Sequence, residues 1–516
     1  MKAVTSKQMR IIERITIEEA GIPSIVLMEN AAIRITEHCL RIINGKQNVK
    51  ILIVCGSGNN GGDGMAVARH LNVKGTEVKI IFAGDMNAIK GDAATNLQIV
   101  KKMEIPIESI QDVNCHQNIQ SIIETSDLVV DAIFGTGLDR NVEGNYKFMT
   151  EMINCYAKYV LSVDMPSGIH SDTGRIMGCA VKATETVTLG CPKTGILLYP
   201  GAEFAGKLHI EDIGIPAALI DKVKTEAKIL SGSEAKNLLP ARRQRSNKGD
   251  YGKVMVFAGS NEMPGAAALA CSASYMTGCG LVRACVLPNV AGVIHHWQRE
   301  VITHNVPEKN GMYCKKSIGN LAEEINRANV LVIGPGIGRS PDVTEFVYEL
   351  ISIAQVPIVL DADALFAVSE NVNILKQIKA PCVITPHPGE MSRLLAGLSI
   401  PDILDDIINA AVKFSADFNV VTLLKDTHTI IANPNGNFYI NTTGNNALSK
   451  AGTGDVLTGM IAGFIAQGPD IFTASALGAY FHGKAGEAAA IKMSHYSVTA
   501  SDIISHIPVV INDCCK

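Results

Sequence analysis

The chain of 516 residues contains 47% hydrophobic and 19% charged residues. Single hydrophobic cores stop growing near about 250–300 residues, so this length predicts two globular domains. The formal net charge is only −4, Lys and Arg form no long run, and no apolar stretch approaches the roughly 18–20 residues that span a bilayer. We therefore expect no nucleic-acid or membrane partner, and small molecules are favoured. The 13 Cys are scattered without a CxxC pair, which indicates reduced thiols in a cytoplasmic protein.

The first expected elements are two helices, followed by a strand and a glycine-rich loop. Apolar residues recur at helical spacing over residues 7–43, and Gly21-Ile22-Pro23 divides this stretch. The strand at 48–55 ends in the loop GSGNNGGDG, and a helix follows. Strand, glycine loop and helix are typical of a turn that holds a nucleotide pyrophosphate. The Asn and Asp side chains of this loop add oxygen ligands that such a turn does not need, although Asn also stabilises ordinary turns.

Two later strands, within 127–137 and 159–168, each deliver an aspartate near the carboxyl end. Ligands bind outside the carboxyl ends of parallel strands, so the loops after these strands and the glycine-rich loop are expected to converge on one pocket. The oxygen ligands of Asn60, Asp131 and Ser167 suit a hard cation rather than zinc.

The segments GNNGGDG, DAIFGTGL, VDMPSG and the later CPKTG resemble the NAD(P)H-hydrate epimerase family over about residues 1–216. The resemblance implies that Asn60, Asp131 and Ser167 bind potassium, and that Asp164 contacts the substrate and acts as an acid/base residue. It also implies that the hydrated dinucleotide is held by Asn59, Asn60, Gly61, Gly62, Asp63, Gly135, Thr136, Gly137, Leu138, Asp139, Arg140 and Asn141.

Epimerisation of such a substrate is chemically simple. In a hydrated nicotinamide the hydroxyl group lies on C6, next to the ring nitrogen. Its loss gives an iminium ion, and water can add again to C6 from either face of the ring. One carboxylate that shuttles a proton would therefore suffice for epimerisation. Asp164 is the expected carboxylate, and the alternative is a structural carboxylate that caps a turn or holds a cation.

A more polar and charged passage, 217–245, is expected to link the first domain, residues 1–216, to a second domain, residues 246–516. Strands and helices alternate again after this passage, which predicts a second parallel sheet. The strands are expected at 253–258, 281–287, 330–333, 357–361, 380–385 and 420–425.

The stretch NNALSKAGTGDVLTG at 445–459 carries the clearest chemistry of the second domain. A helix is expected to begin at about Gly454, and glycines with free N–H groups at a helix start favour phosphate. Asp455, one residue further on, can act as general base for phosphoryl transfer to a hydroxyl, and the alternative is that it only complements the helix dipole. The segments GPGIG, DADA and TPHPGEM and the residue Lys425 also lie at expected strand ends, so the same sheet edge should gather them.

Together, KGDYGKVMVFAGS, GPGIGR, DADAL, TPHPGEMSRL and AGTGDVLTGMIAG resemble the ribokinase-like superfamily and, more narrowly, ADP-dependent (S)-NAD(P)H-hydrate dehydratases, from about residue 248 to the C-terminus. The resemblance implies that ADP phosphorylates the C6 hydroxyl, that phosphate is then eliminated, that Mg²⁺ bridges the nucleotide phosphates and that Asp455 is catalytic. The residues implied to contact the hydrate are Gly336, His387, Pro388, Gly389, Glu390, Met391, Ser392 and Arg393. Those implied to hold ADP are Lys425, Asp426, Thr427, His428, Thr429, Asn445, Asn446, Ala447, Leu448, Ser449, Lys450, Ala451, Gly452, Thr453 and Gly454.

We therefore expect an α/β protein with two doubly wound domains, an N-terminal Rossmann-like three-layer sandwich and a C-terminal ribokinase-like domain. The expected function is repair of hydrated NADH and NADPH. The first domain would interconvert the R and S hydrates, and the second would dehydrate the S form at the expense of ADP, giving AMP and phosphate. The expected partners are NADHX, NADPHX and ADP, and the chain is expected to form a homo-oligomer. Two alternatives remain open: a ribokinase-type small-molecule kinase with a nucleotide-sensing N-terminal domain, and a binding module whose N-terminal domain holds a nucleotide without chemistry.

Overall fold

The chain divides into two compact units, Lys2–Ala227 and Lys228–Lys516, and Met1 is grouped with the second. The computed structural model describes residues 1–44, 46, 48–110, 116–400 and 406–516. The division falls inside the passage that the sequence predicts as a linker. That passage contains α8 (Ala217–Lys222), β8 (Ala227–Lys228) and α9 (Gly232–Leu238). None of the helices in the described ranges is both long and apolar enough to cross a membrane.

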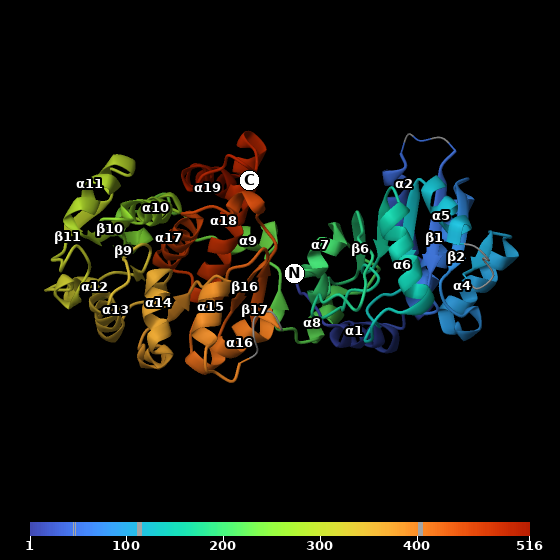
Figure 1. Cartoon of the computed structure of the whole chain (residues 1–516), viewed down its shortest axis with the longest axis horizontal. Helices are drawn as coiled ribbons and strands as arrows, with labels where there is room; N and C mark the ends of the chain where they lie inside the picture. Colours follow the sequence, from blue (N-terminus) through green and yellow to red (C-terminus); the bar gives the residue numbers. More distant parts are fainter. Residues whose placement is uncertain (45, 47, 111–115, 401–405) are drawn as a thin grey trace. The chain divides into compact units, whose positions relative to one another are not determined.

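The first unit, coloured blue to green in Figure 1, is built on a parallel sheet of seven strands in the order β3-β2-β1-β4-β5-β6-β7. The strands are β1 (Lys50–Cys55), β2 (Glu77–Phe82), β3 (Ile107–Ser109), β4 (Leu128–Ala132), β5 (Val160–Val163), β6 (Glu185–Leu189) and β7 (Lys207–Glu211). The helices are α1 (Ser6–Glu19), α2 (Ser24–Ile42), α3 (Asn59–Val73), α4 (Gly91–Lys102), α5 (His116–Thr125), α6 (Gly144–Tyr156), α7 (Gly201–Ala205) and α8.

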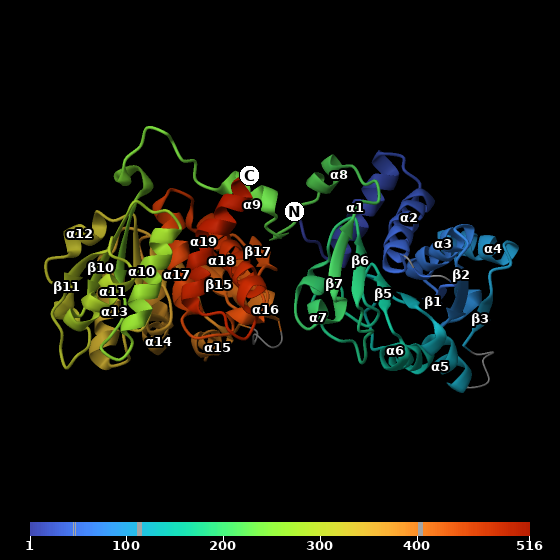
Figure 2. The same ribbon diagram turned by 90° about the horizontal axis from the view of Figure 1, so that it is seen from above.

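Strand β1 shows why this sheet has helices on both faces. Successive side chains of a strand point to opposite faces, and both sets are apolar here. Ile51 and Ile53 belong to a core formed with α1, α2, α3 and α4, whereas Leu52 and Val54 belong to a second core formed with α5 and α6. Figure 2 shows α2, α3 and α4 on one side of the sheet and α5 and α6 on the other. The expected Rossmann-like three-layer sandwich is therefore confirmed.

The strand order also indicates where a ligand binds. The chain builds outward from β1 to β3 on one side, then returns to add β4 beside β1. Such a switch point leaves a crevice at the carboxyl ends of the two central strands, which is where open α/β sheets bind ligands.

The second unit contains a ten-stranded sheet in the order β11-β10-β9-β12-β13-β14-β15-β16-β17-β8. Its strands are β9 (Lys253–Phe257), β10 (Leu281–Val286), β11 (Ile302–Asn305), β12 (Val330–Ile333), β13 (Ile358–Leu360), β14 (Cys382–Ile384), β15 (Val421–Leu424), β16 (Thr429–Ala432), β17 (Phe438–Asn441) and β8. Strands β9 to β15 are parallel, whereas β16 pairs antiparallel with both β15 and β17. This antiparallel edge was not predicted from the sequence.

Helices cover both faces of the second sheet, as expected for a doubly wound domain. Figure 1 shows α10, α17, α18 and α19 along one side and α13, α14, α15 and α16 along the other. The helices are α10 (Pro264–Met276), α11 (Pro288–Trp297), α12 (Ala322–Asn326), α13 (Pro341–Ile353), α14 (Asp363–Glu370), α15 (Pro388–Leu395), α16 (Ile407–Phe418), α17 (Thr453–Ala466), α18 (Ile471–Met493), α19 (Ala500–Cys515) and α9.

Helix α17 is held tightly against α10, and this contact fixes the position of its first turn. A Cβ atom added at Gly459 would lie 2.2 Å from the backbone oxygen of Ala270, so only glycine permits this approach. The Ser274 hydroxyl donates a 2.9 Å hydrogen bond to the Gly459 carbonyl from the same side. The carboxylate at the start of α17 is therefore carried by a rigid element.

Candidate functional sites

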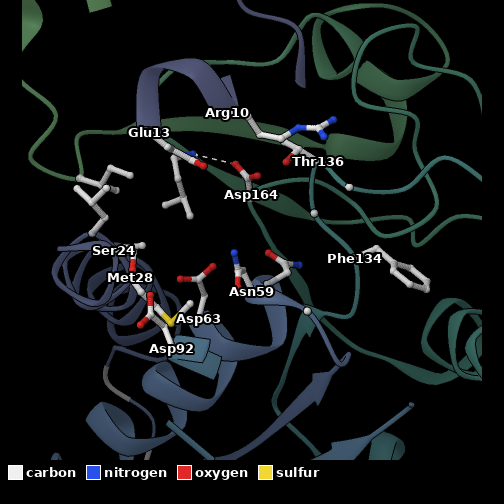
Figure 3. A pocket seen from close by; sticks show the side chains of 18 of the residues that line it. Arg10, Glu13, Ser24, Met28, Asn59, Asp63, Asp92, Phe134, Thr136 and Asp164 are labelled. Atoms are coloured by element: carbon white, nitrogen blue, oxygen red, sulfur yellow. Dashed lines mark hydrogen bonds between the residues drawn. The ribbon is translucent and has the colours of Figure 1, made fainter. Parts of the chain in front are cut away.

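The first unit contains a cavity of about 490 Å³ beside the β1–β4 switch point (Figure 3). Its walls come from the loop and first helical turn after β1, the loop after β4, the end of β5, and helices α1 and α2. The predicted residues that line it are Asn59, Asn60, Asp63, Gly135, Thr136, Gly137, Leu138 and Asp164. Gly61 and Gly62 are buried in α3, whereas Asp139, Arg140 and Asn141 are exposed and are not among the lining residues.

The glycine-rich segment after β1 is packed against its own backbone and against the backbone that follows β4. A Cβ atom added at Gly61 would lie 1.9 Å from the backbone oxygen of Gly56, and one at Gly56 would lie 2.1 Å from that of Ile133. At Gly58, by contrast, a Cβ atom would meet open space. Glycine is thus required at 56 and 61 for close packing at the β1–β4 crevice.

We expect Gly61→Ala to destabilise the first unit by about 1–3 kcal/mol, because the added methyl group must displace backbone. Gly58→Ala is the matched control, with a smaller expected loss. Urea denaturation monitored on the first unit measures both free energies of unfolding. Equal stability of the two variants would contradict the packing that we describe.

Asp164 follows β5 and is held in an unusual backbone conformation. Its φ of +65° lies in the left-handed region that non-glycine residues rarely adopt. Its Oδ1 accepts hydrogen bonds from Lys193 Nζ, from Thr188 Oγ1 at 3.3 Å and from the Leu189 backbone N at 3.2 Å. Lys193 is only 1% exposed, and its Nζ also donates to the Leu189 carbonyl at 3.0 Å. A strained backbone beside a buried ion pair is typical of a functional site.

Two more carboxyl groups, those of Glu13 and Asp63, line the same cavity. Burial raises the pKa of Asp63 well above its ordinary value, and the neighbouring Asp164 and Glu13 raise it further, while Lys193 opposes them. Burial also raises the pKa of Glu13, with Lys193 lowering it and Asp164 raising it. Three carboxyl groups thus surround one lysine.

Sequence reasoning assigned no role to Glu13 or Lys193. For Glu13 a signal was present, because this charged residue shares a helix face with Met9, Ile12 and Thr16, which are buried. For Lys193 the quoted segment CPKTG gave no indication that the lysine turns inward.

Asn60 lines this cavity, and Asp131 and Ser167 are hydrogen-bonded to Ile133 and Phe134 of its wall. The surroundings of these three residues fit a cation. The Asp131 carboxylate is completely buried, and it accepts hydrogen bonds from Ser167 Oγ (2.5 Å), Ser167 N (2.9 Å), Ser162 Oγ (2.8 Å) and Ile133 N (3.3 Å). Burial raises its pKa, whereas the hydrogen bonds from Ser167 and Ser162 oppose that rise. Within the described ranges no basic side chain pairs with it.

Asn60 adds an independent sign of the same kind. Its amide nitrogen is buried and finds no hydrogen-bond partner in the described part of the chain. With the amide turned about its last bond, Asn60 would present a carbonyl oxygen at that place. An amide oxygen, and a buried carboxylate that has no basic partner in the described ranges, are ligand types that suit a hard cation.

The second unit places Asp455 in the first turn of α17, as expected from the sequence. Gly452, with φ of +88°, precedes the helix, and no side chain caps its N-terminus. Burial raises the pKa of Asp455 to about 7, with a further contribution from Asp361 that Lys425 partly offsets. In the described part of the chain its carboxyl group makes no hydrogen bond or ion pair. It is therefore available to a bound hydroxyl group as a base near neutral pH.

Lys425, at the end of β15, connects the strand ends around Asp455. Its Nζ lies 3.0 Å from Asp361 Oδ1 and 3.9 Å from Glu390 Oε2. Burial lowers the pKa of Lys425, but Asp361 and Glu390 outweigh it and raise the pKa. A Cβ atom added at Gly454 would lie 3.6 Å from Lys425 Nζ. The lysine charge therefore lies beside the open N-terminus of α17, where a phosphate group is favoured.

The predicted hydrate-binding residues fall into different environments. Gly336 has a φ of +63°, and Met391 is fully buried. The His387 ring caps α15 by accepting hydrogen bonds from Gly389 N (3.0 Å) and Glu390 N (3.3 Å). Arg393 lies 5.5 Å from the centre of the Phe366 ring. Pro388 and Ser392 also lie on α15.

The predicted ADP-binding residues form two segments. Residues 425–429 run from the end of β15 through an exposed turn to the start of β16. Residues 445–454 run through a short 3₁₀ turn to α17, where Thr453 Oγ1 donates to the Leu448 carbonyl at 2.9 Å. The Lys450 side chain donates at 2.6 Å to the Tyr496 carbonyl.

His482 of α18 is a further residue near this segment that sequence reasoning missed. Burial lowers the pKa of this histidine to about 4, and the Thr453 backbone and Lys425 act on it as well. Its Nε2 atom finds no partner in the described ranges. A neutral imidazole therefore stands beside the predicted phosphate loop.

Comparison with known proteins gives matches over both units. A family described as YjeF-related protein N-terminus matches residues 24–195, and a family described as NAD(P)H-hydrate dehydratase matches residues 254–509. A ribokinase-like superfamily protein from Enterococcus faecalis V583 is similar in structure, with a TM-score of 0.50 and 23% identity over 56% of this chain and 97% of that chain. This last likeness confirms the ribokinase-like fold of the second unit.

Two relatives match almost the whole chain. The bifunctional NAD(P)H-hydrate repair enzyme Nnr of Moorella thermoacetica is 41% identical over 99% of this chain and 97% of its own length. The enzyme of the same name from Thermofilum pendens is 34% identical over 98% of this chain and 96% of its own length. The chain therefore belongs to the family of bifunctional NAD(P)H-hydrate repair enzymes.

Proposed function

We propose that the first unit interconverts the R and S hydrates of NADH and NADPH. The cavity at the β1–β4 switch point has the position expected for a dinucleotide, with Asn59 at the start of α3 and Thr136 in the loop after β4. Asp164, oriented by Lys193, assists loss and return of the C6 hydroxyl group by moving a proton. The twelve Cys in the described ranges form no disulfides, which supports a cytoplasmic location of the enzyme.

The second unit, in this proposal, dehydrates the S hydrate at the expense of ADP. Asp455 removes the proton of the C6 hydroxyl while that oxygen accepts the terminal phosphoryl group of ADP, leaving AMP. The C6–O bond then breaks, and phosphate leaves with the bonding electrons. Loss of a proton from C5 forms the C5–C6 double bond of the ring. The observation that carries this proposal is Asp455 itself: a rigidly placed carboxyl group without a partner in the described ranges, whose pKa is raised to about 7.

The groups around Asp455 fit a nucleotide phosphate. Lys425 and the open N-terminus of α17 supply positive charge to the phosphates. Both act electrostatically, without forming a covalent bond to a reacting atom. Magnesium would supply further positive charge beside the nucleotide phosphates. The nearby carboxylate of Asp361 is occupied by Lys425 and by Thr458 Oγ1 (2.7 Å), so we expect the nucleotide rather than a protein cage to provide most magnesium ligands.

The proposal is tested by giving the purified chain the S hydrate with ADP and magnesium. We expect reduced nicotinamide, AMP and phosphate in equal amounts, and no reaction without nucleotide. The R hydrate without nucleotide is expected to give a mixture of epimers. Formation of a stable phosphorylated hydrate would contradict the dehydratase assignment, and an unchanged R hydrate would contradict the epimerase assignment.

We further propose that potassium occupies the site formed by Asn60, Asp131 and Ser167, where it would offset the Asp131 charge. Replacing potassium with tetramethylammonium is then expected to destabilise the first unit by about 1–3 kcal/mol. Asp131→Asn is expected to remove this dependence on potassium. Thermal unfolding in the two salts measures the effect, and the transition of the second unit is the internal control. A first unit that unfolds identically in both salts would contradict a potassium site.

A further inference from the structure

The epimerase cavity holds more carboxyl groups than its ion pair uses. Asp164 is paired with Lys193, but Asp63 and Glu13 make no hydrogen bond or ion pair in the described part of the chain. Asp63 is only 9% exposed. Burying a carboxyl group without a partner costs stability, so packing gives no reason for Asp63.

Asp63 and Asp164 approach the cavity from different elements. Asp63 comes from the first turns of α3, after β1, and Asp164 comes from the end of β5. Figure 3 shows both carboxyl groups directed into the same space, Asp164 from one side and Asp63 from the other, with Asn59 beside them. A flat ring placed between them would present one face to each carboxyl group.

Epimerisation makes a demand that this arrangement meets. The hydroxyl group leaves as water from one face of the ring, so a proton must be delivered on that face. Water then adds to the other face and must lose a proton there. One group serving both faces would have to move across the ring, whereas two groups on opposite sides need not move.

We propose that Asp63 is a second catalytic residue of the epimerase site, acting opposite Asp164. This inference rests on the proposed epimerisation. Protonated Asp63 gives its proton to the C6 hydroxyl group of one epimer, the C–O bond breaks, and the ring nitrogen lone pair forms the iminium ion. Water adds to C6 from the Asp164 side and transfers a proton to that carboxylate. The result is the other epimer, with the proton moved from Asp63 to Asp164, and this state serves the reverse reaction.

The groups that face Asp63 support this division of labour. Glu13 on α1 and Asp164 after β5 are negative neighbours that favour a proton on Asp63, and Cys55 on β1 lies close by. Lys193, after β6, opposes them but is hydrogen-bonded to Asp164 instead. The surroundings of Asp63 thus favour its protonated form, whereas Asp164 is ion-paired with Lys193 in the same cavity.

The test compares Asp63→Asn with wild type in the full chain. Epimerisation of the R hydrate is followed without nucleotide, at varied substrate concentration and pH. We expect kcat to fall by about 10²–10⁴-fold with little change in KM, because Asn keeps the shape but supplies no proton. Wild-type kcat should fall on the alkaline side as Asp63 loses its proton, and the residual rate of the variant should not.

Two controls accompany this comparison. Dehydration of the S hydrate by the second unit of the same chain should be unchanged, and the thermal midpoint of the first unit should be at or above that of wild type, because an unpaired buried carboxyl group has been removed. Asp221→Asn alters an exposed carboxyl group of α8 that is not among the residues lining the cavity, and it should leave epimerisation unchanged. An Asp63→Asn variant with unchanged kcat, with a raised KM alone, or with the alkaline limb retained would overturn the inference. A wild type that fails to interconvert the epimers would overturn the proposed function as well.

Discussion

Asp455→Asn is expected to abolish dehydration of the S hydrate, with kcat reduced by about 10²–10⁴-fold, because the variant lacks the base that accepts the hydroxyl proton. Wild-type kcat should rise with pH and level off above about 7, where Asp455 is deprotonated. Epimerisation by the first unit should be unaffected. Equal dehydration by wild type and variant would contradict the assignment of Asp455 as base.

The same substitution should increase the stability of the folded chain at alkaline pH, although it abolishes dehydration. The folded-state pKa of Asp455 is raised from 3.8 to about 7, so the folded chain binds the extra proton between these values. Wild-type stability therefore falls as pH rises through this window, and the Asn variant lacks that loss. At pH above 7 the variant should be more stable by up to about 4 kcal/mol, and near pH 4 the two should be equal.

Urea denaturation at both pH values measures this difference. Asp417→Asn is a suitable control, because Asp417 is an exposed carboxylate of the same unit. It should change neither activity nor stability. An Asp455→Asn variant that is less stable than wild type at alkaline pH would show that the carboxylate is stabilised rather than strained by its surroundings.

Lys425→Met is expected to have the second large effect. Removing this lysine leaves Asp361 and Glu390 without their common partner, and loss of one partner of a largely buried ion pair costs about 3–5 kcal/mol. The pKa of Asp455 should also rise above about 7, because Lys425 lowers it in the wild type. Any remaining dehydration should then require more alkaline pH, and ADP should bind more weakly.

The pH dependence separates this account from general damage to the fold. The pH–rate profile of Lys425→Met should reach half of its maximal rate at a higher pH than that of the wild type. The denaturation curve of the variant is measured alongside it. Lys425→Arg keeps the charge and is the matched control, with a smaller displacement expected. A destabilised Met variant whose midpoint stays in place would show that Lys425 does not act on Asp455.

The sequence was sufficient to predict the parts of the fold that depend on local patterns. The apolar run of β1 and the glycine loop after it predicted a strand, a close turn and a helix, and the structure has β1 and α3 at those places. The start of α17 was expected at about Gly454 and lies at Thr453. In each case the pattern follows from the residues of one short segment.

Contacts between distant segments could not be predicted from the sequence. Lys193 bonds to Asp164, 29 positions away, and nothing in CPKTG indicates whether its lysine faces solvent or the cavity. Glu13 reaches the same cavity from α1, and its place on the buried face of that helix indicates an inward side chain but not the cavity that it enters. The hairpin β16–β17 is made of short strands whose pairing depends on the sheet edge beside them.

The most direct test of the two-site account is the recovery of reduced nicotinamide from an equal mixture of R and S hydrates, with ADP and magnesium present. The wild type should convert the whole mixture, because the first unit supplies the epimer that the second consumes. Asp164→Asn should convert only the S share, and Asp455→Asn should convert none. A wild type that consumes nucleotide but yields a phosphorylated product without reduced nicotinamide would contradict the account and favour a kinase.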